Sequence, residues 1–205
     1  MKKQALVILS RYLWPVDGGR KESLNHYIKE LYDNYNYNIT VLCFLEAGQK
    51  ITEKDKPYYI FEIKALDDVD GVEKAKNIIW HSLIKEQWPL QCSMYYSKRN
   101  KDIISQYVAK LKPDLIFAEM IRTCTYYDAF MDCKAVKLAN LDDLLSTRYE
   151  RQLSSKYSAA SFTGAYGGKL PGWMKRFTSW KFIKNIVLRM ESKRCRKWEN
   201  IVNAP

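Results

Sequence analysis

Short apolar runs alternate with stretches of helical periodicity along the first 141 residues. The run at residues 4–10 is nearly continuous and bounded by polar residues, as is typical of a strand buried on both faces of a parallel sheet. Further strands are predicted at residues 39–45, 58–63, 115–118 and 135–141. Apolar residues at a spacing of three or four predict helices around residues 24–31, 72–85, 103–111 and 123–131. This alternation predicts an α/β fold, a Rossmann-like parallel sheet with helices on both faces.

The character of the sequence changes after residue 150. Residues 154–172 are rich in Ser, Ala, Gly and Tyr and predict a mobile loop, whereas residues 173–198 interleave aromatic residues with cations. The latter pattern predicts a basic amphipathic helix. We therefore expect a Rossmann-like domain at residues 1–150. Residues 151–205 are expected to be a loop and a helical segment that packs on this domain, on a second domain or on a membrane.

The positive charge is concentrated in the same segment. Residues 151–205 hold twelve Lys or Arg and two acids, a net +10, which leaves +1 of the total +11 for the first 150 residues. This asymmetry suggests a polyanionic neighbour: nucleic acid, anionic lipid, or the diphosphate of a nucleotide-linked or lipid-linked substrate.

The aromatic and basic segment admits three interpretations. Its rings and cations suit an anionic membrane surface, they can stack on bases and neutralise phosphates, and a helical hairpin can pack its apolar face on the protein itself. The first and third are compatible with each other. The residues predicted to face a membrane are Trp173, Lys175, Arg176, Phe177, Trp180 and Lys181.

Several kinds of site are disfavoured by the residues that they need. The five cysteines are odd in number and scattered without metal-ligand spacing, so we expect reduced, buried thiols and no metal site. His26 and His81 fall in helical stretches without acid or cysteine partners, and no hydrolytic triad can be identified. The apolar stretches are too short for a signal peptide or a spanning helix. The expected location is the cytoplasm, at the inner face of the plasma membrane.

The first candidate site is the loop that follows the first strand. Gly18 and Gly19 precede a helix, where glycine permits positive φ and close approach of the backbone to a ligand. The free N–H groups and dipole of the helix attract phosphate or sugar oxygens, and Arg20 can support a phosphate. The alternative is a tight turn between strand and helix without a ligand.

Two further groups of polar residues follow predicted strands. Glu119 and Arg122 come after the strand at residues 115–118, and Glu119 is either a catalytic or sugar-binding acid or a helix cap. Asp142 lies after the strand at residues 135–141, where it either binds a ligand or caps the next helix. Arg148, on that helix, either meets a phosphate or pairs with a nearby acid.

Four stretches together resemble a known enzyme family. Residues 5–19 read Ala-Leu-Val-Ile-Leu-Ser-Arg-Tyr-Leu-Trp-Pro-Val-Asp-Gly-Gly, and residues 38–42 read Asn-Ile-Thr-Val-Leu. Residues 112–117 read Lys-Pro-Asp-Leu-Ile-Phe, and residues 140–149 read Asn-Leu-Asp-Asp-Leu-Leu-Ser-Thr-Arg-Tyr. The chain resembles the amino-terminal domain of GT-B glycosyltransferases of the family-4 type over nearly its whole length. The last stretch is similar to a motif of a polysaccharide-biosynthesis sugar transferase subgroup.

The resemblance implies one half of a GT-B fold, a Rossmann-like domain that binds the acceptor. The reaction implied is transfer of a sugar from a nucleotide-sugar donor to a glycan or lipid-linked acceptor in surface polysaccharide synthesis. The donor, bound mainly by a second Rossmann-like domain or subunit, is a substrate, and no cofactor is expected. The resemblance implies that Gly18, Gly19 and Arg20 approach the donor diphosphate or the acceptor.

A hexosyltransferase-type activity is implied for a full-length protein, and we expect this chain alone to be inactive, because it ends about where the family's first domain ends. Two alternatives remain. One is a non-catalytic or membrane-anchoring subunit of a split glycosyltransferase. The other is a basic nucleic-acid-binding α/β protein, against which the nearly neutral first 150 residues argue, so nucleic acid is not an expected partner.

Overall fold

Five parallel strands form one sheet in the described part of the chain. The computed structural model describes residues 2–46, 48–52, 54, 56–141, 144–154 and 181–202, with side chains of the last range from residue 185 onward. The strands are β1 (Lys3–Leu9), β2 (Tyr37–Phe44), β3 (Ile60–Leu66), β4 (Leu115–Glu119) and β5 (Val136–Asn140). Their order is β3-β2-β1-β4-β5, with every neighbouring pair parallel. This is the strand order of Rossmann-like folds.

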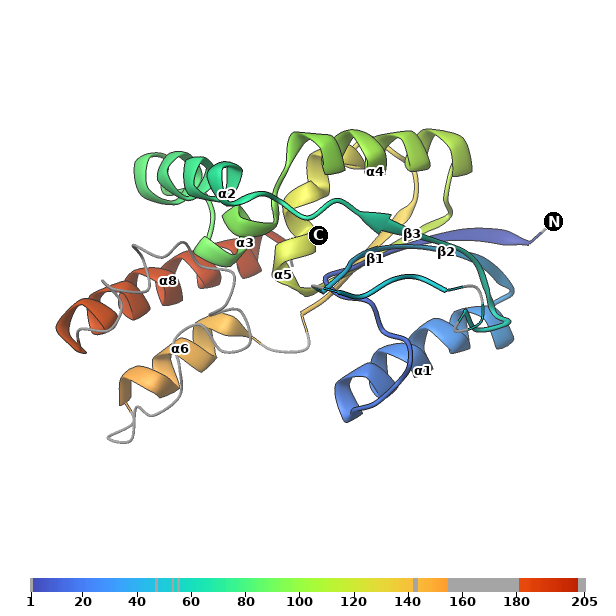
Figure 1. Cartoon of the computed structure of the whole chain (residues 1–205), viewed down its shortest axis with the longest axis horizontal. Helices are drawn as coiled ribbons and strands as arrows, with labels where there is room; N and C mark the ends of the chain where they lie inside the picture. The colour runs from blue at the N-terminus through green and yellow to red at the C-terminus, as the bar shows by residue number, and fades with distance from the viewer. Residues whose placement is uncertain are drawn as a thin grey trace. The chain divides into compact units, whose positions relative to one another are not determined.

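The helices of this sheet cover both of its faces. α1 (Gly19–Asp33) and α4 (Lys98–Leu111) lie on opposite sides, as Figure 1 shows. A short helix, α5 (Met120–Thr123), follows β4 directly and continues as a 3-10 helix, η3 (Cys124–Ala129). The helix expected at residues 123–131 therefore begins and ends earlier. The predicted Rossmann-like parallel sheet with helices on both faces is confirmed.

The centre of the sheet explains why its first strand is so apolar. β1 pairs with β2 on one side and with β4 on the other, and Val7 lies opposite both Val41 and Phe117. All residues from Ala5 to Leu9 are buried. A strand with neighbours on both edges and helices on both faces has no solvent side, so alternation of polar and apolar residues is absent.

The chain divides into two compact units, each made of two separate stretches. The first comprises Met1–Asp68 and Tyr96–Asn140 and contains the sheet, and the second comprises Val69–Tyr95 and Leu141–Pro205. The second unit contains α2 (Gly71–Asn77), the π-helix η2 (Ile78–Ile84), α3 (Leu90–Tyr95), α6 (Leu145–Ser154) and α8 (Lys181–Val202). The domain boundary expected after residue 150 stays a prediction.

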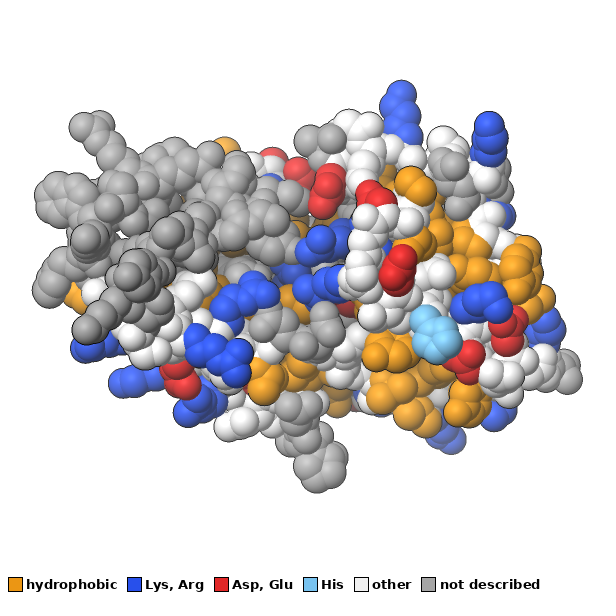
Figure 2. All heavy atoms as spheres, turned by 90° about the horizontal axis from the view of Figure 1, so that it is seen from below, with side chains coloured by type: hydrophobic (Ala, Val, Ile, Leu, Met, Phe, Trp, Pro, Cys, Tyr) orange, Lys and Arg blue, Asp and Glu red, His pale blue; other side chains and the backbone are white. Residues whose placement is uncertain are grey.

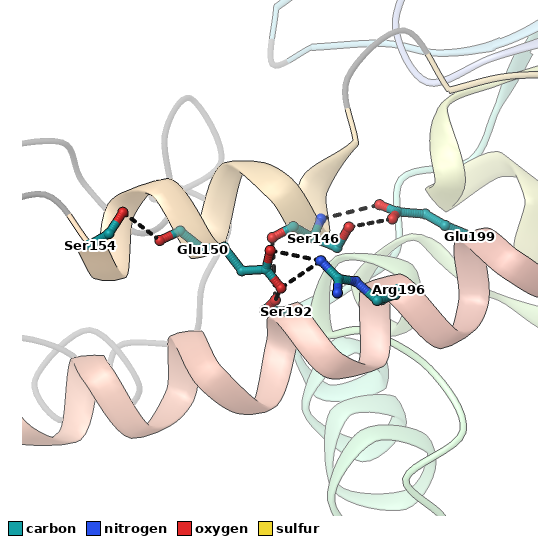
Figure 3. A network of polar contacts seen from close by, with 6 residues as sticks. All are labelled: Ser146, Glu150, Ser154, Ser192, Arg196 and Glu199. Carbon is teal, nitrogen blue, oxygen red and sulfur yellow. Dashed lines mark hydrogen bonds and ion pairs between the residues drawn. The ribbon is translucent and has the colours of Figure 1, made fainter.

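Two buried glutamates of α8 hold the first turns of two other helices in the second unit. Glu191 accepts a hydrogen bond of 2.8 Å from the backbone N–H of Leu90, the first residue of α3. Glu199 accepts bonds from the backbone N–H and the hydroxyl of Ser146 in α6, at 3.2 and 2.6 Å. Figure 3 shows the contacts between α6 and α8. Both glutamates therefore satisfy first-turn amides, which have no partner within their own helix.

The carboxyl of Glu191 makes this unit sensitive to pH. Burial raises its pKa to about 7 from an ordinary 4.5, although the Leu90 N–H and the Arg194 guanidinium favour the ionised form. The folded state binds this proton more tightly than the unfolded chain does. The resulting stabilisation is therefore complete below the unfolded pKa and is lost as the pH rises through about 7.

We predict that the free energy of unfolding falls between about pH 4.5 and pH 7, by up to about 1.4 kcal/mol per pH unit from this group. Glu191→Gln is expected to remove this part of the dependence, because glutamine does not titrate. Urea unfolding of both proteins across the range measures it. An equal pH dependence in the two proteins would contradict the prediction.

The cysteines behave as the sequence predicts. All five are free, with four buried and Cys133 partly buried. Burial raises the pKa of Cys43 and Cys124 to about 12, which keeps both thiols protonated near neutral pH.

Within the described residues, the structure contains no helix that is both long and apolar enough to cross a membrane.

Candidate functional site

The candidate site lies where β1 and β4 end side by side in the first unit. Within the sheet, β2 and β3 lie beyond one edge of β1, and β4 and β5 lie beyond its other edge. The strand order therefore reverses between β1 and β4. Ligands of open α/β sheets bind outside the carboxyl ends of the strands at such a point. Ser10 follows β1 here, Glu119 ends β4, and the loop after Ser10 leads to the first turn of α1.

Glu119 connects these three elements through both of its carboxylate oxygens. Its Oε2 accepts a bond of 2.9 Å from the backbone N–H of Ser10 and a second bond from the Ser10 hydroxyl. Its Oε1 accepts a bond of 2.8 Å from the Arg20 guanidinium in the first turn of α1. The Glu119 side chain is fully buried, and that of Arg20 is 28% exposed. Glu119 therefore holds the Arg20 guanidinium in place, while part of the Arg20 side chain remains exposed to solvent.

The turn after Glu119 is strained and held by side-chain bonds. Met120 has φ 68°, a left-handed conformation that costs a residue with a Cβ about 1–2 kcal/mol. The Thr123 hydroxyl donates to the carbonyl of Glu119 at 2.8 Å and closes the turn. Strain of this kind persists where the surroundings enforce it, and such positions cluster at binding and catalytic sites. The strained turn therefore adds to the case for this edge of the sheet.

The two glycines leave open space at the start of α1. Gly18 is the N-cap and is extended, with φ −172°, and Gly19 is the first helical residue, so positive φ is not the reason for glycine at Gly18. The prediction that Gly18 is needed for a positive φ is therefore wrong. A Cβ added to Gly18 or Gly19 would meet no atom within 4 Å. Protein packing therefore does not require glycine at either position, whereas a ligand approaching the backbone would.

The surface of α1 carries no excess charge of one sign. Its fifteen residues include three acids, Glu22, Glu30 and Asp33, and the cations Arg20, Lys21 and Lys29. Figure 2 views the side on which α1 lies and shows acidic, basic and apolar side chains intermixed over this helix. Any affinity for an anion at the start of α1 must therefore come from local groups. These are Arg20 and the backbone N–H groups of the first turn, which Gly18 cannot cap with a side chain.

The other predicted site residues do not all fall at this edge. Arg122 lies in α5, one turn beyond Glu119, and is almost completely buried. Arg148 is exposed on α6 of the second unit. Asp142 lies outside the described residues, as do Trp173, Lys175, Arg176, Phe177 and Trp180. Lys181 begins α8, but its side chain is outside the described part.

Ser10 is the site residue that the sequence analysis did not single out. It is buried, and both its backbone N–H and its hydroxyl bond to Glu119. One signal was available, because Ser10 is the polar residue that directly follows the buried run of β1, and such positions lie at the ligand edge of a parallel sheet. Its partner, 109 residues away, carries no signal in the sequence.

Comparisons with known proteins identify similarity to solved structures but no related sequence family. No family model matches the chain, and a search of curated proteins finds no match. The chain is similar to the structure of Phytolacca americana UGT2 complexed with UDP-2fluoro-glucose and pterostilbene, at 11% sequence identity and a TM-score of 0.43. The similarity covers 77% of this chain and 36% of that chain, so this chain spans little more than a third of the length of the protein it matches.

Proposed function

We propose that this chain is the acceptor-binding half of a glycosyltransferase, and that the start of α1 binds the diphosphate of its substrate. The observation that carries the proposal is the placement of Arg20 by the buried Glu119, beside an open helix N-terminus at the reversal of strand order. The glycosyltransferase assignment itself draws on the motif resemblance at residues 5–19, 38–42, 112–117 and 140–149.

The chemistry proposed is transfer of a sugar from a nucleotide sugar to a glycan or lipid-linked acceptor. The bond between C1 of the sugar and the diphosphate breaks, a bond from C1 to the acceptor oxygen forms, and the acceptor proton leaves to a base. Arg20 and the first-turn N–H groups stabilise the negative charge of a diphosphate. In this proposal Glu119 positions Arg20, and its predicted catalytic role stays a prediction.

The remaining expectations form part of the same proposal. A second Rossmann-like domain or subunit supplies most donor contacts, which is why we expect no transfer by this chain alone. Peripheral attachment to the inner face of the plasma membrane, through residues 173–181, and a place in surface polysaccharide synthesis also stay proposals. The motif that resembles the polysaccharide-biosynthesis subgroup, at residues 140–149, supports the latter.

Loss of the Arg20 guanidinium is expected to weaken diphosphate binding. Arg20→Ala should bind uridine diphosphate about 10-fold to 100-fold more weakly than the parent chain, because a charge-assisted bond to phosphate contributes about 1.5–3 kcal/mol. Isothermal titration calorimetry measures the change. A short isoprenyl diphosphate titrated in parallel distinguishes a nucleotide-linked from a lipid-linked source of the diphosphate.

Lys21→Ala is the matched control, since it removes the same charge one residue further along. Lys21 pairs with Asp17 at 2.8 Å on the surface, and we expect its loss to change binding less than about twofold. Gly19→Ala separates binding from folding, because alanine favours the helix but obstructs the backbone N–H groups. Equal losses for Arg20→Ala and Lys21→Ala would reject a specific site at the start of α1.

A further inference from the structure

The helix formed by α2 and η2 turns its large apolar side chains outward. Its buried positions are Lys74, Ile78 and Ser82, one helical turn apart, and the hydroxyls of Ser82 and Ser93 share a hydrogen bond of 2.7 Å. The exposed large apolar side chains are Val72, Ile79, Trp80, Leu83 and Ile84. We call these five residues the outer stripe. Ile78 is the one large apolar residue of this helix that is buried, whereas a surface helix normally buries most such residues.

The outer stripe is not the scatter of single apolar residues that every protein surface contains. Four of its five members fall within the seven residues of η2, on consecutive turns. Trp80 and Leu83 are 50% and 49% exposed, which leaves roughly half of each side chain in water. Contiguous apolar surface of this kind marks a place where another apolar phase or partner binds.

Lysines lie among the apolar side chains of the outer stripe. Lys76 is exposed and lies one turn after Val72 and one turn before Trp80. The ammonium of Lys85 lies 5.1 Å from the centre of the Trp80 ring. Tryptophan and lysine both have an apolar body and a polar end, which suits the boundary between lipid headgroups and acyl chains.

The charge of the second unit favours an anionic surface over a neutral one. The stretch 69–95, which carries the outer stripe, holds three lysines and three acids, whereas the stretch 141–205 holds thirteen Lys or Arg and five acids, so the net +8 of this unit comes from the second stretch. On α8, Arg189, Lys193 and Lys197 are exposed, whereas its two acids, Glu191 and Glu199, are buried. The exposed charge of the described part of α8 is therefore entirely positive.

We propose that the outer stripe docks onto an anionic lipid surface, with Trp80, Leu83 and Ile84 entering the headgroup boundary and the lysines contacting lipid phosphates. Burial of the half-exposed side chains supplies the apolar contribution, and the cations make it selective for anionic lipid. The outer stripe shares no residue with the segment 173–181 or with the diphosphate site proposed for the first unit. It requires no transferase chemistry.

Co-sedimentation of the full 205-residue chain with lipid vesicles tests the proposal. The chain is expected to bind vesicles of phosphatidylcholine with about one third phosphatidylserine, and to bind pure phosphatidylcholine much more weakly. The double variant Trp80→Ser, Leu83→Ser should bind the anionic vesicles at least about tenfold more weakly, because each side chain loses apolar contact with the lipid. Lys76→Gln with Lys85→Gln should weaken binding about fivefold per lysine.

The matched control is Phe61→Ser with Leu138→Ser on the edge strands β3 and β5. These side chains are 62% and 48% exposed, similar to the test pair, and we expect lipid binding to be unchanged. Circular dichroism verifies that each variant folds. The Trp80→Ser, Leu83→Ser variant should bind uridine diphosphate as the parent chain does, because the proposed diphosphate site lies at the start of α1. Failure of the parent chain to bind anionic vesicles, or undiminished binding by the test pair, would overturn the proposal. So would concentration-dependent self-association that only the test pair abolishes.

Discussion

Glu119→Ala is expected to lower the free energy of unfolding of the first unit by about 3 kcal/mol. The change leaves the buried Ser10 N–H and hydroxyl without their acceptor, and it leaves the Arg20 guanidinium without its carboxylate. An unsatisfied buried donor costs about 1–3 kcal/mol, and breaking a buried ion pair costs more. Arg20 is partly exposed, which places the expected loss at the lower end for such pairs. Urea unfolding followed by circular dichroism measures it.

Asp114 provides a control within the same pair of strands. Its carboxylate accepts a bond of 2.8 Å from the backbone N–H of Gln4, so it joins β4 to β1 at the opposite end, but it lies in solvent. Asp114→Ala should therefore cost no more than about 1 kcal/mol, because water replaces the lost contact. Similar losses for Asp114→Ala and Glu119→Ala would show that burial of Glu119 has no special role.

Glu199→Ala is expected to destabilise the second unit by about 2–3 kcal/mol. Both donors of Ser146 lose their acceptor in a buried environment, and the first turn of α6 loses its cap. Hydrogen exchange of the α6 amides and urea unfolding both measure the effect, and the exchange data assign it to the second unit. We expect faster exchange along α6 and unchanged exchange in β1 and β4.

Glu150→Ala serves as the comparison on the other side of the same helix pair. Glu150 on α6 accepts two bonds of 2.7 Å from the Arg196 guanidinium on α8, but the two side chains are 47% and 56% exposed (Figure 3). An exposed ion pair contributes at most about 1 kcal/mol even with two bonds. If Glu150→Ala proved as damaging as Glu199→Ala, the buried cap would not be what stabilises α6.

The sheet could be predicted from the sequence because its strands are buried on both faces. A short, continuous apolar run that polar residues bound, with helical periodicity after it, is typical of such a strand. The edge strand β5 is less well marked, since Val136 and Leu138 are exposed, and its bounds came out shorter than expected. The short helices were harder still. α3 was not predicted, because its six residues are too few to show apolar residues that repeat at helical spacing.

The candidate site could be predicted only in part. Gly18, Gly19 and Glu119 stood out because they follow predicted strands, and Arg20 because it follows the glycines. The bonds from Ser10 and Arg20 to Glu119 span 109 and 99 residues, so only the fold brings these groups together. The sequence also left the role of Glu119 open between ligand contact and helix cap. In the structure Glu119 is the N-cap residue of α5, but its side chain makes no cap hydrogen bond, so the predicted capping by its carboxylate is wrong. The carboxylate instead joins β1 to α1.

The two acids in the basic segment 151–205 indicate which side of its helix faces the protein, which the net charge of the segment does not show. Glu191 and Glu199 are the only acids among residues 151–205, beside twelve cations. Both are buried and both accept bonds from first-turn N–H groups. An acid that stands alone in a strongly basic amphipathic helix marks the side that faces the protein, whereas the cations mark the side that faces solvent.

Amide chemical-shift mapping by NMR with uridine diphosphate glucose tests the central claim most directly. We predict that the backbone amides of Gly18, Gly19 and Arg20 shift on titration of the labelled chain, together with that of Ser10, because the diphosphate binds the first turn of α1. The second unit should stay unchanged despite its larger positive charge. Shifts confined to α8 or to other basic surface, with none at Gly18 to Arg20, would contradict a diphosphate site between β1 and β4.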